Sequence, residues 1–252
     1  MEQAGSLGFS HFLAQTDSLG KVILVIMLVM SVATWYLIVT KGIEALARKR
    51  RGTRFLAFFW DSPSLAAVER HLEEHHPNDP FSHLAYHAIV SSRHHARHGL
   101  NKLNETGSGA DFLTRSIRRV IDEETAKLES GLTVLASVGS TAPFVGLFGT
   151  VWGVYHALVA IGLAGQGTLD RIAGPVGEAL IMTALGLAVA IPAVLAYNAL
   201  VRSNRLVLAR LDAFAHDLFA FLTTGAHFNE TDAANSARAA GTGPRGVIKG
   251  AA

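Results

Sequence analysis

Two threonines and one glutamate are the polar groups best placed for chemistry in the most apolar part of the sequence. Between residues 130 and 201 three residues carry a formal charge, and of these Glu178 is the carboxylate that could lie within an apolar segment. Thr150 and Thr183 supply hydroxyls, which both donate and accept hydrogen bonds. A charge held in hydrocarbon costs roughly 3 kcal/mol or more, so its retention indicates a use. These groups are candidates for an ion path. Glu178 also follows Pro175 closely, and an acid at a helix start would be stabilised by the helix dipole.

A second polar constellation is a run of histidines. Eight of the twelve histidines lie between residues 71 and 98. The segment from His71 to His75 has the H-x-x-E-H pattern of some zinc peptidases, and two histidines one helical turn apart can bind zinc. No third ligand is evident, however, and Pro77 ends the helix soon afterwards. We therefore expect a solvated polar face and no functional metal site, with adventitious metal binding as the next interpretation.

Three long apolar segments must position these groups. Each reaches the length of about 20 residues that crosses a bilayer as a helix. Basic residues follow the first and third segments, and such residues stay in the cytoplasm. The predicted organisation is an outer terminus (1–20), a first span (21–40), a cytoplasmic helical domain (41–130), a second span (131–163), an outer loop (164–175), a third span (176–201), a cytoplasmic helix (202–228) and a disordered tail (229–252).

This layout places His156 near the outer end of the second span, beside Trp152 and Tyr155. An ionisable group at membrane depth is a functional candidate, but an interfacial aromatic belt explains the cluster better. Aspartate and glutamate are absent from the middle of all three spans. If the protein conducts protons, a partner must therefore supply the central carboxylate.

The cytoplasmic domain is expected to be helical, with breaks where proline and glycine gather. Ser62 and Pro63 indicate a helix start with Ser62 or Asp61 as its cap. A second break is expected at residues 77–80 and a loop at residues 99–109. From about residue 111 apolar residues recur at helical spacing. This helix is expected to continue without interruption into the second span.

Small residues recur every three or four positions along the second and third spans. A repeat of about 3.5 residues favours a left-handed supercoil, and small residues let membrane helices approach closely. The stripes are predicted either to pack the helices within one subunit or to line an oligomer axis. Their principal members are Gly139, Pro143, Gly146 and Gly153 in the second span, and Ala179, Gly186 and Ala190 in the third.

Two motifs in these spans resemble the MotA/TolQ/ExbB proton-channel family, and most closely its ExbB members. The first is the run from Ala142 to Gly153, APFVGLFGTVWG. The second begins at Glu178 with EALIMTALG and continues at Ala190 with AIPA. The resemblance is ordered over a stretch of about 75 residues and agrees with three spans. The histidine run is not part of the family pattern.

The resemblance implies a subunit of a proton-driven motor in the bacterial inner membrane. Such proteins form a homo-oligomer, a pentamer, whose pore encloses the single membrane helices of two ExbD-type subunits, each with an essential aspartate. Proton flow energises TonB for the uptake of iron–siderophores and vitamin B12. The family's pore threonines match Thr150 and Thr183, and its membrane glutamate matches Glu178, which would adjust proton uptake into the path or subunit contact. On an ideal helix Glu178 and Thr183 lie about 140° apart.

We therefore expect an all-α membrane pore protein that is not an enzyme and uses no cofactor. The net charge of +2 is too small to suggest nucleic-acid binding, and the absence of cysteine excludes disulfides and thiolate metal sites. The nearest alternative is a TolQ-like role in the Tol-Pal cell-envelope system. A secondary transporter is a different class, but the spans show no inverted repeat and no polar midplane cluster. A purely structural membrane scaffold is the third alternative.

Overall fold

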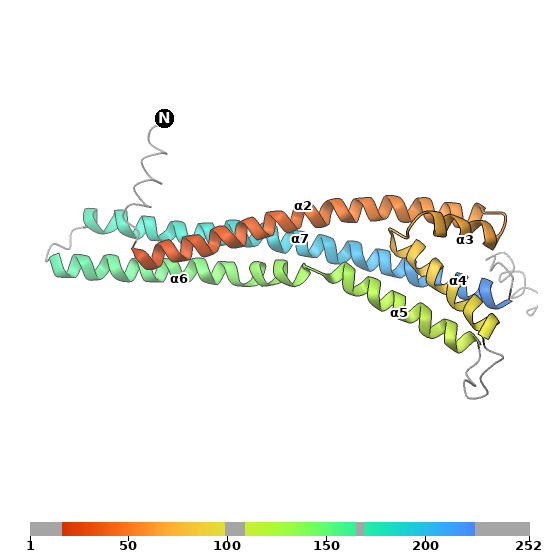
Figure 1. Ribbon diagram of the computed structural model, residues 1–252. Coiled ribbons are helices and arrows are strands. Elements are labelled where there is room, and N and C mark those ends of the chain that lie inside the picture. The colour runs from red at the N-terminus through yellow and green to blue at the C-terminus, as the bar shows by residue number, and fades with distance from the viewer. Residues whose placement is uncertain (1–16, 99–108, 165–168, 225–252) are drawn as a thin grey trace, which may run out of the picture. The chain divides into compact units, whose positions relative to one another are not determined.

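The computed structural model describes residues 17–98, 109–164 and 169–224, and every regular element among them is an α-helix (Figure 1). The predicted tail, and most of the predicted outer terminus, lie outside the described residues. The helices are α2 (Ser18–Asp61), α3 (Leu65–Glu74), α4 (Pro80–His98), α5 (Gly109–Glu129), α6 (Leu132–Ala164) and α7 (Leu169–Thr224). Three helical stretches in these ranges are long and apolar enough to cross a membrane, which agrees with the predicted all-α membrane protein.

The chain divides into two compact units, and each is described by itself. The first, which we call the span unit, comprises Met1–Lys49 and Ala126–Leu206. The second, the extension unit, comprises Arg50–Thr125 and Val207–Ala252. The helices α2 and α7 contribute residues to both units.

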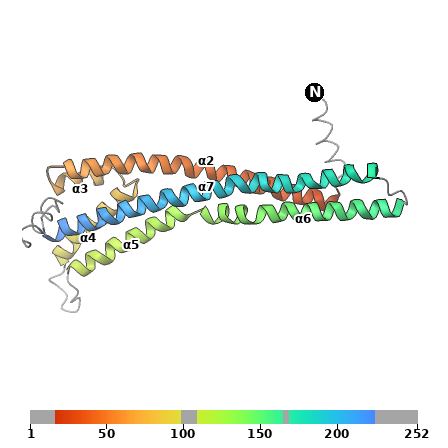
Figure 2. The same ribbon diagram turned by 180° about the vertical axis from the view of Figure 1, so that it is seen from behind.

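In the span unit, α6 lies alongside the first part of α7, and the first part of α2 packs on both (Figures 1 and 2). One apolar cluster joins Leu135 of α6 to Ala193 of α7 and Leu37 of α2. Another joins Met182 of α7 to Met27 of α2. Many large apolar side chains of these helices stay exposed, as expected for surfaces that meet lipid or other subunits.

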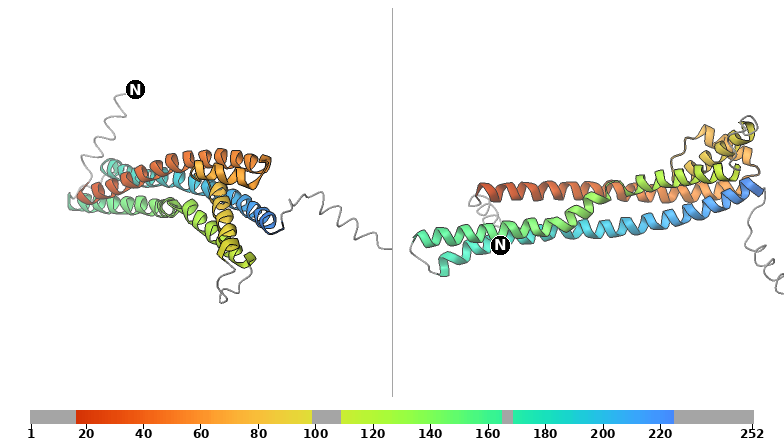
Figure 3. Two further views of the ribbon diagram at one scale, coloured as in Figure 1. Left: turned by 45° about the vertical axis from the view of Figure 1, so that its right-hand side comes forward. Right: turned by 90° about the horizontal axis from the view of Figure 1, so that it is seen from below.

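The extension unit has its own apolar core, built from the ends of α2 and α7 with α3, α4 and α5 (Figure 3). Phe214 of α7 lies at the centre of an aromatic group and makes edge contacts with Phe55, Phe59 and Trp60. Such pairs are each worth about 1 kcal/mol beyond the apolar area they bury. The unit is therefore a packed helical assembly with a core of its own.

The helix starts in the extension unit follow from capping residues. The predicted start at Ser62 and Pro63 is wrong by two residues, because Ser64 is the cap of α3 and its hydroxyl accepts a hydrogen bond from the Ala67 N–H. The break at residues 77–80 is confirmed. There Asp79 caps α4 by accepting from the Phe81 N–H at 3.0 Å, and proline in the first turn needs no N–H partner.

The predicted uninterrupted helix from about residue 111 into the second span is wrong. The backbone leaves the helix at Ser130 and Gly131, between α5 and α6, and Gly131 has a φ of +82°. Glycine adopts this left-handed conformation without a Cβ penalty and commonly ends helices. The buried side chain of Asn204 in α7 donates to the Leu128 carbonyl at 2.7 Å, so this carbonyl near the break has a partner.

The predicted outer loop at 164–175 is also shorter than expected, because α7 already begins at Leu169. Pro175 and the neighbouring glycines suggested a loop. Helices in membranes tolerate such residues, because proline removes only one intrahelical hydrogen bond and surrounding groups compensate. The start of α7 therefore cannot be located from proline and glycine alone.

Candidate functional site

The two helices that carry the candidate threonines approach each other most closely at a pair of glycines. A Cβ placed on Gly146 of α6 would lie 2.7 Å from the Met182 carbonyl oxygen and 3.0 Å from the Cα of Gly186. A Cβ on Gly186 would meet the Ala142 carbonyl oxygen at 2.7 Å. These neighbours are backbone atoms, which cannot move aside as a flexible side chain could. Glycine is therefore required at both positions for this approach.

The rest of the two stripes follows the same contact between α6 and α7. A Cβ on Gly139 would collide with the Val194 side chain, and one on Gly153 would lie 3.0 Å from the Ala179 Cβ. Ala179 and Ala190 are buried, and Pro143 lies within α6. Within one chain the small residues thus pack the two helices together, as expected where lipid supplies no hydrophobic drive.

This close approach brings Thr150 and Thr183 into contact, and we call them the hydroxyl pair. Their Oγ1 atoms lie 2.5 Å apart. The Thr150 Oγ1 also lies 3.2 Å from the carbonyl oxygens of Gly146, in the preceding turn of α6, and of Ala179, on α7. Thr150 is 8% exposed, whereas Thr183 is half-buried. Thr150 is therefore the less accessible member of the pair.

The hydroxyl pair can rearrange its hydrogen bonds without moving heavy atoms. A threonine hydroxyl donates one hydrogen bond and can accept two. Thr150 has three acceptors within reach but one proton, so when it donates to a carbonyl, Thr183 can donate to Thr150. When Thr150 donates to Thr183 instead, the hydroxyl proton of Thr183 is directed away from Thr150. This two-state arrangement is what a link in a proton relay needs.

Glu178 lies in the third turn of α7, because the helix begins at Leu169. The helix dipole acts mainly within the first turn. The interpretation of Glu178 as a helix-start residue therefore loses its structural basis. Its side chain lies outside the described residues, so its orientation relative to Thr183 stays a prediction.

A contact that the sequence did not indicate joins α6 to the beginning of α2. The Trp152 indole Nε1 donates to Asp17 Oδ2 at 2.7 Å, and Asp17 Oδ1 accepts from the Gly20 N–H at 2.8 Å. The hydrogen bond from Trp152 is the main cause that lowers the pKa of the Asp17 carboxyl below its ordinary value. The His156 ring lies tilted against the Trp152 ring, with centroids 4.4 Å apart. The aspartate directly before an apolar helix was the available signal, because aspartate is a common N-cap.

The histidines of the extension unit form pairs. His71 stacks on His75 with ring centroids 4.6 Å apart. His83 Nδ1 lies 2.9 Å from Oε1 of Glu124, a carboxylate on α5 that is 6% exposed. Among the residues described, no three histidine or acidic side chains are placed to hold one metal ion. The His71–His75 contact thus lies at the end of α3, whereas His83 contributes to the packing of α4 against α5.

Comparison with known proteins finds similar sequences over most of the chain. Residues 87–213 match the MotA/TolQ/ExbB proton channel family. The chain is 44% identical over 227 residues to the biopolymer transport protein ExbB of Xanthomonas campestris pv. campestris strain B100, covering 87% of this chain and 90% of the relative. It is 43% identical over 207 residues to ExbB of Neisseria meningitidis strain Z2491, covering 78% of this chain and 88% of that protein.

The chain belongs to the MotA/TolQ/ExbB proton channel family. It is ExbB-like within that family, since its identity to the Tol-Pal system protein TolQ of Pseudomonas aeruginosa PAO1 is lower, at 33% over 200 residues, with 79% of this chain and 86% of TolQ covered. The matched range includes α6 and the hydroxyl pair.

Proposed function

We propose that this ExbB-like chain is a subunit of an inner-membrane motor driven by the proton-motive force. With an ExbD-type single-span partner it conducts protons and energises TonB for outer-membrane uptake of iron–siderophores and vitamin B12. The observation that carries the proposal is the hydroxyl pair at the contact of α6 and α7, within a chain that is 43–44% identical to ExbB proteins. No enzymatic step and no cofactor is part of this mechanism.

In the proposed pathway Thr150 and Thr183 pass protons, and Glu178 adjusts proton uptake into the path or the contact between subunits. Hydroxyls exchange protons by reorienting, but they do not hold a charge at neutral pH. A titratable group that can take up and release a proton is therefore needed beside them. The three apolar spans contain no aspartate or glutamate at their centres. This composition supports a partner carboxylate that stands next to the hydroxyl pair.

The proposed topology places the amino terminus in the periplasm and the carboxyl terminus in the cytoplasm. Its support is the basic run after the apolar part of α2, Lys41 to Arg54, and the arginines from Arg202 to Arg210 on α7. The stretch from residue 164 to residue 175 carries a single basic residue, Arg171. We further propose a pentamer that encloses two partner helices, a stoichiometry that native mass spectrometry of the gently extracted complex measures directly.

The test is complementation of a strain that lacks the gene. We expect the deletion strain to starve for iron on iron-limited medium in which iron–siderophore complexes are the iron source, and we expect the wild-type gene to restore growth. A strain carrying Thr150→Ala with Thr183→Ala should assemble the complex but fail to grow. Normal iron-limited growth of this double variant would exclude the hydroxyl pair as the pathway.

A TolQ-like role is the second candidate, favoured by the 33% identity to a TolQ protein over 79% of this chain. The same deletion strain separates the two functions. Sensitivity to detergents and growth in chains, with normal iron uptake, would indicate the Tol-Pal system and would refute the TonB assignment.

A further inference from the structure

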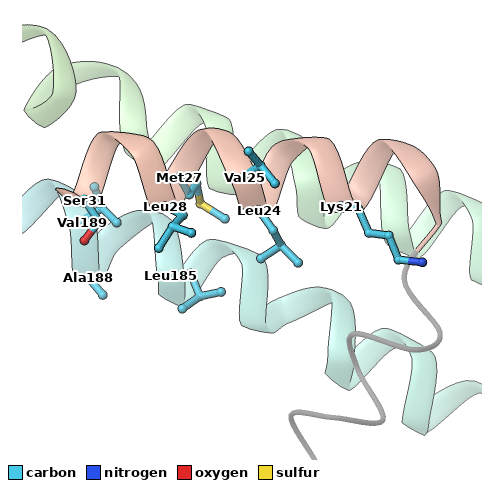
Figure 4. A pocket seen from close by; sticks show the side chains of 9 residues that line it. All are labelled: Lys21, Leu24, Val25, Met27, Leu28, Ser31, Leu185, Ala188 and Val189. Carbon is cyan, nitrogen blue, oxygen red and sulfur yellow. The ribbon is translucent and has the colours of Figure 1, made fainter. Parts of the chain in front are cut away.

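An apolar groove runs between α2 and α7 in the span unit. Its volume is about 560 Å³. Figure 4 shows its walls, with Lys21 at one end and Ser31 at the other. The lining residues are Lys21, Leu24, Val25, Met27, Leu28 and Ser31 of α2, and Leu185, Ala188 and Val189 of α7.

The length of the groove corresponds to one leaflet of a bilayer. Ten residues separate Lys21 from Ser31 on α2, which is about 15 Å at the helical rise. The hydrocarbon core of a bilayer is about 30 Å thick, so one leaflet contributes about 15 Å. A chain that enters at the Lys21 end would thus reach the bilayer midplane near Ser31.

The charge of the groove is concentrated at its outer end. Lys21 is the single formally charged residue between positions 18 and 40, and it is exposed at the start of α2. A lysine near the end of a membrane helix holds its ammonium at the level of the lipid headgroups. Asp17, one turn earlier, accepts hydrogen bonds from Trp152 and from the Gly20 N–H. A phosphate at headgroup level complements the Lys21 ammonium.

The walls favour an acyl chain over a partner helix. Closely packed membrane helices meet through small residues, as α6 and α7 do at Gly146 and Gly186. The groove instead presents branched and flexible side chains such as Leu28 and Leu185, with Ala188 as its only small apolar residue. Such a surface suits a chain that adjusts its conformation along the groove.

We propose that this groove binds one anionic glycerophospholipid, with an acyl chain between α2 and α7 and its phosphate on the Lys21 ammonium. The lipid belongs to the leaflet at the amino-terminal end of α2, which is the periplasmic leaflet in the topology proposed above. Leu185 follows Thr183 by two residues on α7. The bound chain therefore supports the segment of α7 that holds one half of the hydroxyl pair.

The experiment is native mass spectrometry of the complex, purified with its co-expressed partners, delipidated and titrated with dioleoylphosphatidylglycerol in detergent micelles. Lys21→Gln should weaken the tightest lipid binding at least about fivefold, because one lysine–headgroup attraction is lost. The matched control is Lys41→Gln, which removes a lysine at the other end of the apolar part of α2, where it pairs with Glu44 at 3.4 Å. This control should bind lipid as the wild type does.

A second variant fills the groove but leaves the Lys21 ammonium in place. Ala188→Trp should also reduce lipid binding at least about fivefold, because the indole occupies the space of the acyl chain. Its control is Leu195→Trp, at an exposed position of α7 that does not line the groove. Soluble glycerol 3-phosphate, which lacks acyl chains, should not compete.

Two results would overturn the proposal. One is unchanged lipid binding in both Lys21→Gln and Ala188→Trp while the controls behave as expected. The other is an efficient cross-link to a second copy or to a partner helix from a photoreactive group attached to Val25→Cys, which would show a protein chain in the groove. Neither result bears on proton conduction, so the lipid site and the proposed function fail independently.

Discussion

Replacing Thr150 with valine tests whether the hydroxyl pair acts in proton transfer or only in packing. Valine keeps the shape of the side chain and removes its hydrogen bonds to Thr183 and to the carbonyls of Gly146 and Ala179. A net hydrogen bond is worth about 1 kcal/mol in folded proteins, and bonds between membrane helices average about 0.6 kcal/mol. Thr183 is half-buried and can regain a water partner. We therefore expect the free energy of unfolding to fall by about 1 kcal/mol.

The chain offers a matched control at Thr34 on α2. Thr34 is 1% exposed, and its Oγ1 makes no hydrogen bond to the part of the chain that the structure describes. Thr34→Val is the same chemical change without the lost bond. Replacing an unpaired buried hydroxyl by a methyl group is neutral or stabilising. Its melting temperature should equal or exceed that of the wild type.

The assay combines thermal unfolding in detergent with proton flux into proteoliposomes that contain the complex with its partner. Thr150→Val should lower the flux by roughly a hundredfold, the usual size of a positioned proton-transfer group, while Thr150→Ser should keep most of it. Thr34→Val should leave the flux unchanged. The relay hypothesis is refuted if Thr150→Val conducts as well as Thr34→Val, or if Thr150→Ser is as inactive as Thr150→Val.

Three further predictions concern other parts of the span unit. Gly146→Ala should destabilise the complex by about 1–3 kcal/mol through overpacking. The control Gly162→Ala, where a Cβ meets nothing within 4 Å, should not lower the melting temperature. Equal melting temperatures of these two variants would contradict the close approach of α6 and α7. Because the pKa of the Asp17 carboxyl is lowered from 3.8, mainly by the Trp152 hydrogen bond, its carboxylate contributes stability that is present above that pH and is lost only as the pH falls below it. The difference in melting temperature between the wild type and Asp17→Asn should therefore not decrease as the pH is lowered from about 8 to about 5; a difference that disappears by pH 5.5 would contradict this. Glu178→Gln should abolish energised uptake in the complementation strain with the complex intact, and retained uptake with only a lower melting temperature would assign Glu178 a structural role.

The sequence by itself determined that this is a helical membrane protein, and it determined which polar residues its spans contain. Three apolar segments of bilayer length require helices, because lipid offers backbone groups no other partners. The ordered motifs around Thr150 and Thr183 identified the family before any coordinates. The break at residues 77–80 followed from proline, which cannot donate within a helix. All of these properties depend on residue type and on neighbours a few positions away.

The histidine run illustrates why a local pattern can mislead about chemistry. The pattern from His71 to His75 satisfies the spacing of a zinc motif, and the structure does bring these two rings into stacking contact. A metal site also needs ligands from other elements. In the described residues the side chain that reaches His83 is Glu124, and the two join α4 to α5.

Only the tertiary structure determined which residues far apart in the sequence come into contact. The hydroxyl pair joins residues 33 positions apart, and the Asp17–Trp152 bond joins residues 135 positions apart. The hydroxyl pair depends on how closely α6 approaches α7, which is set by backbone contacts at Gly146 and Gly186. The Asp17–Trp152 bond depends on where the start of α2 lies against α6. The ends of helices also needed the structure. Gly131 ends α5 because its φ is positive, and a sequence containing many glycines does not reveal which of them adopts that conformation.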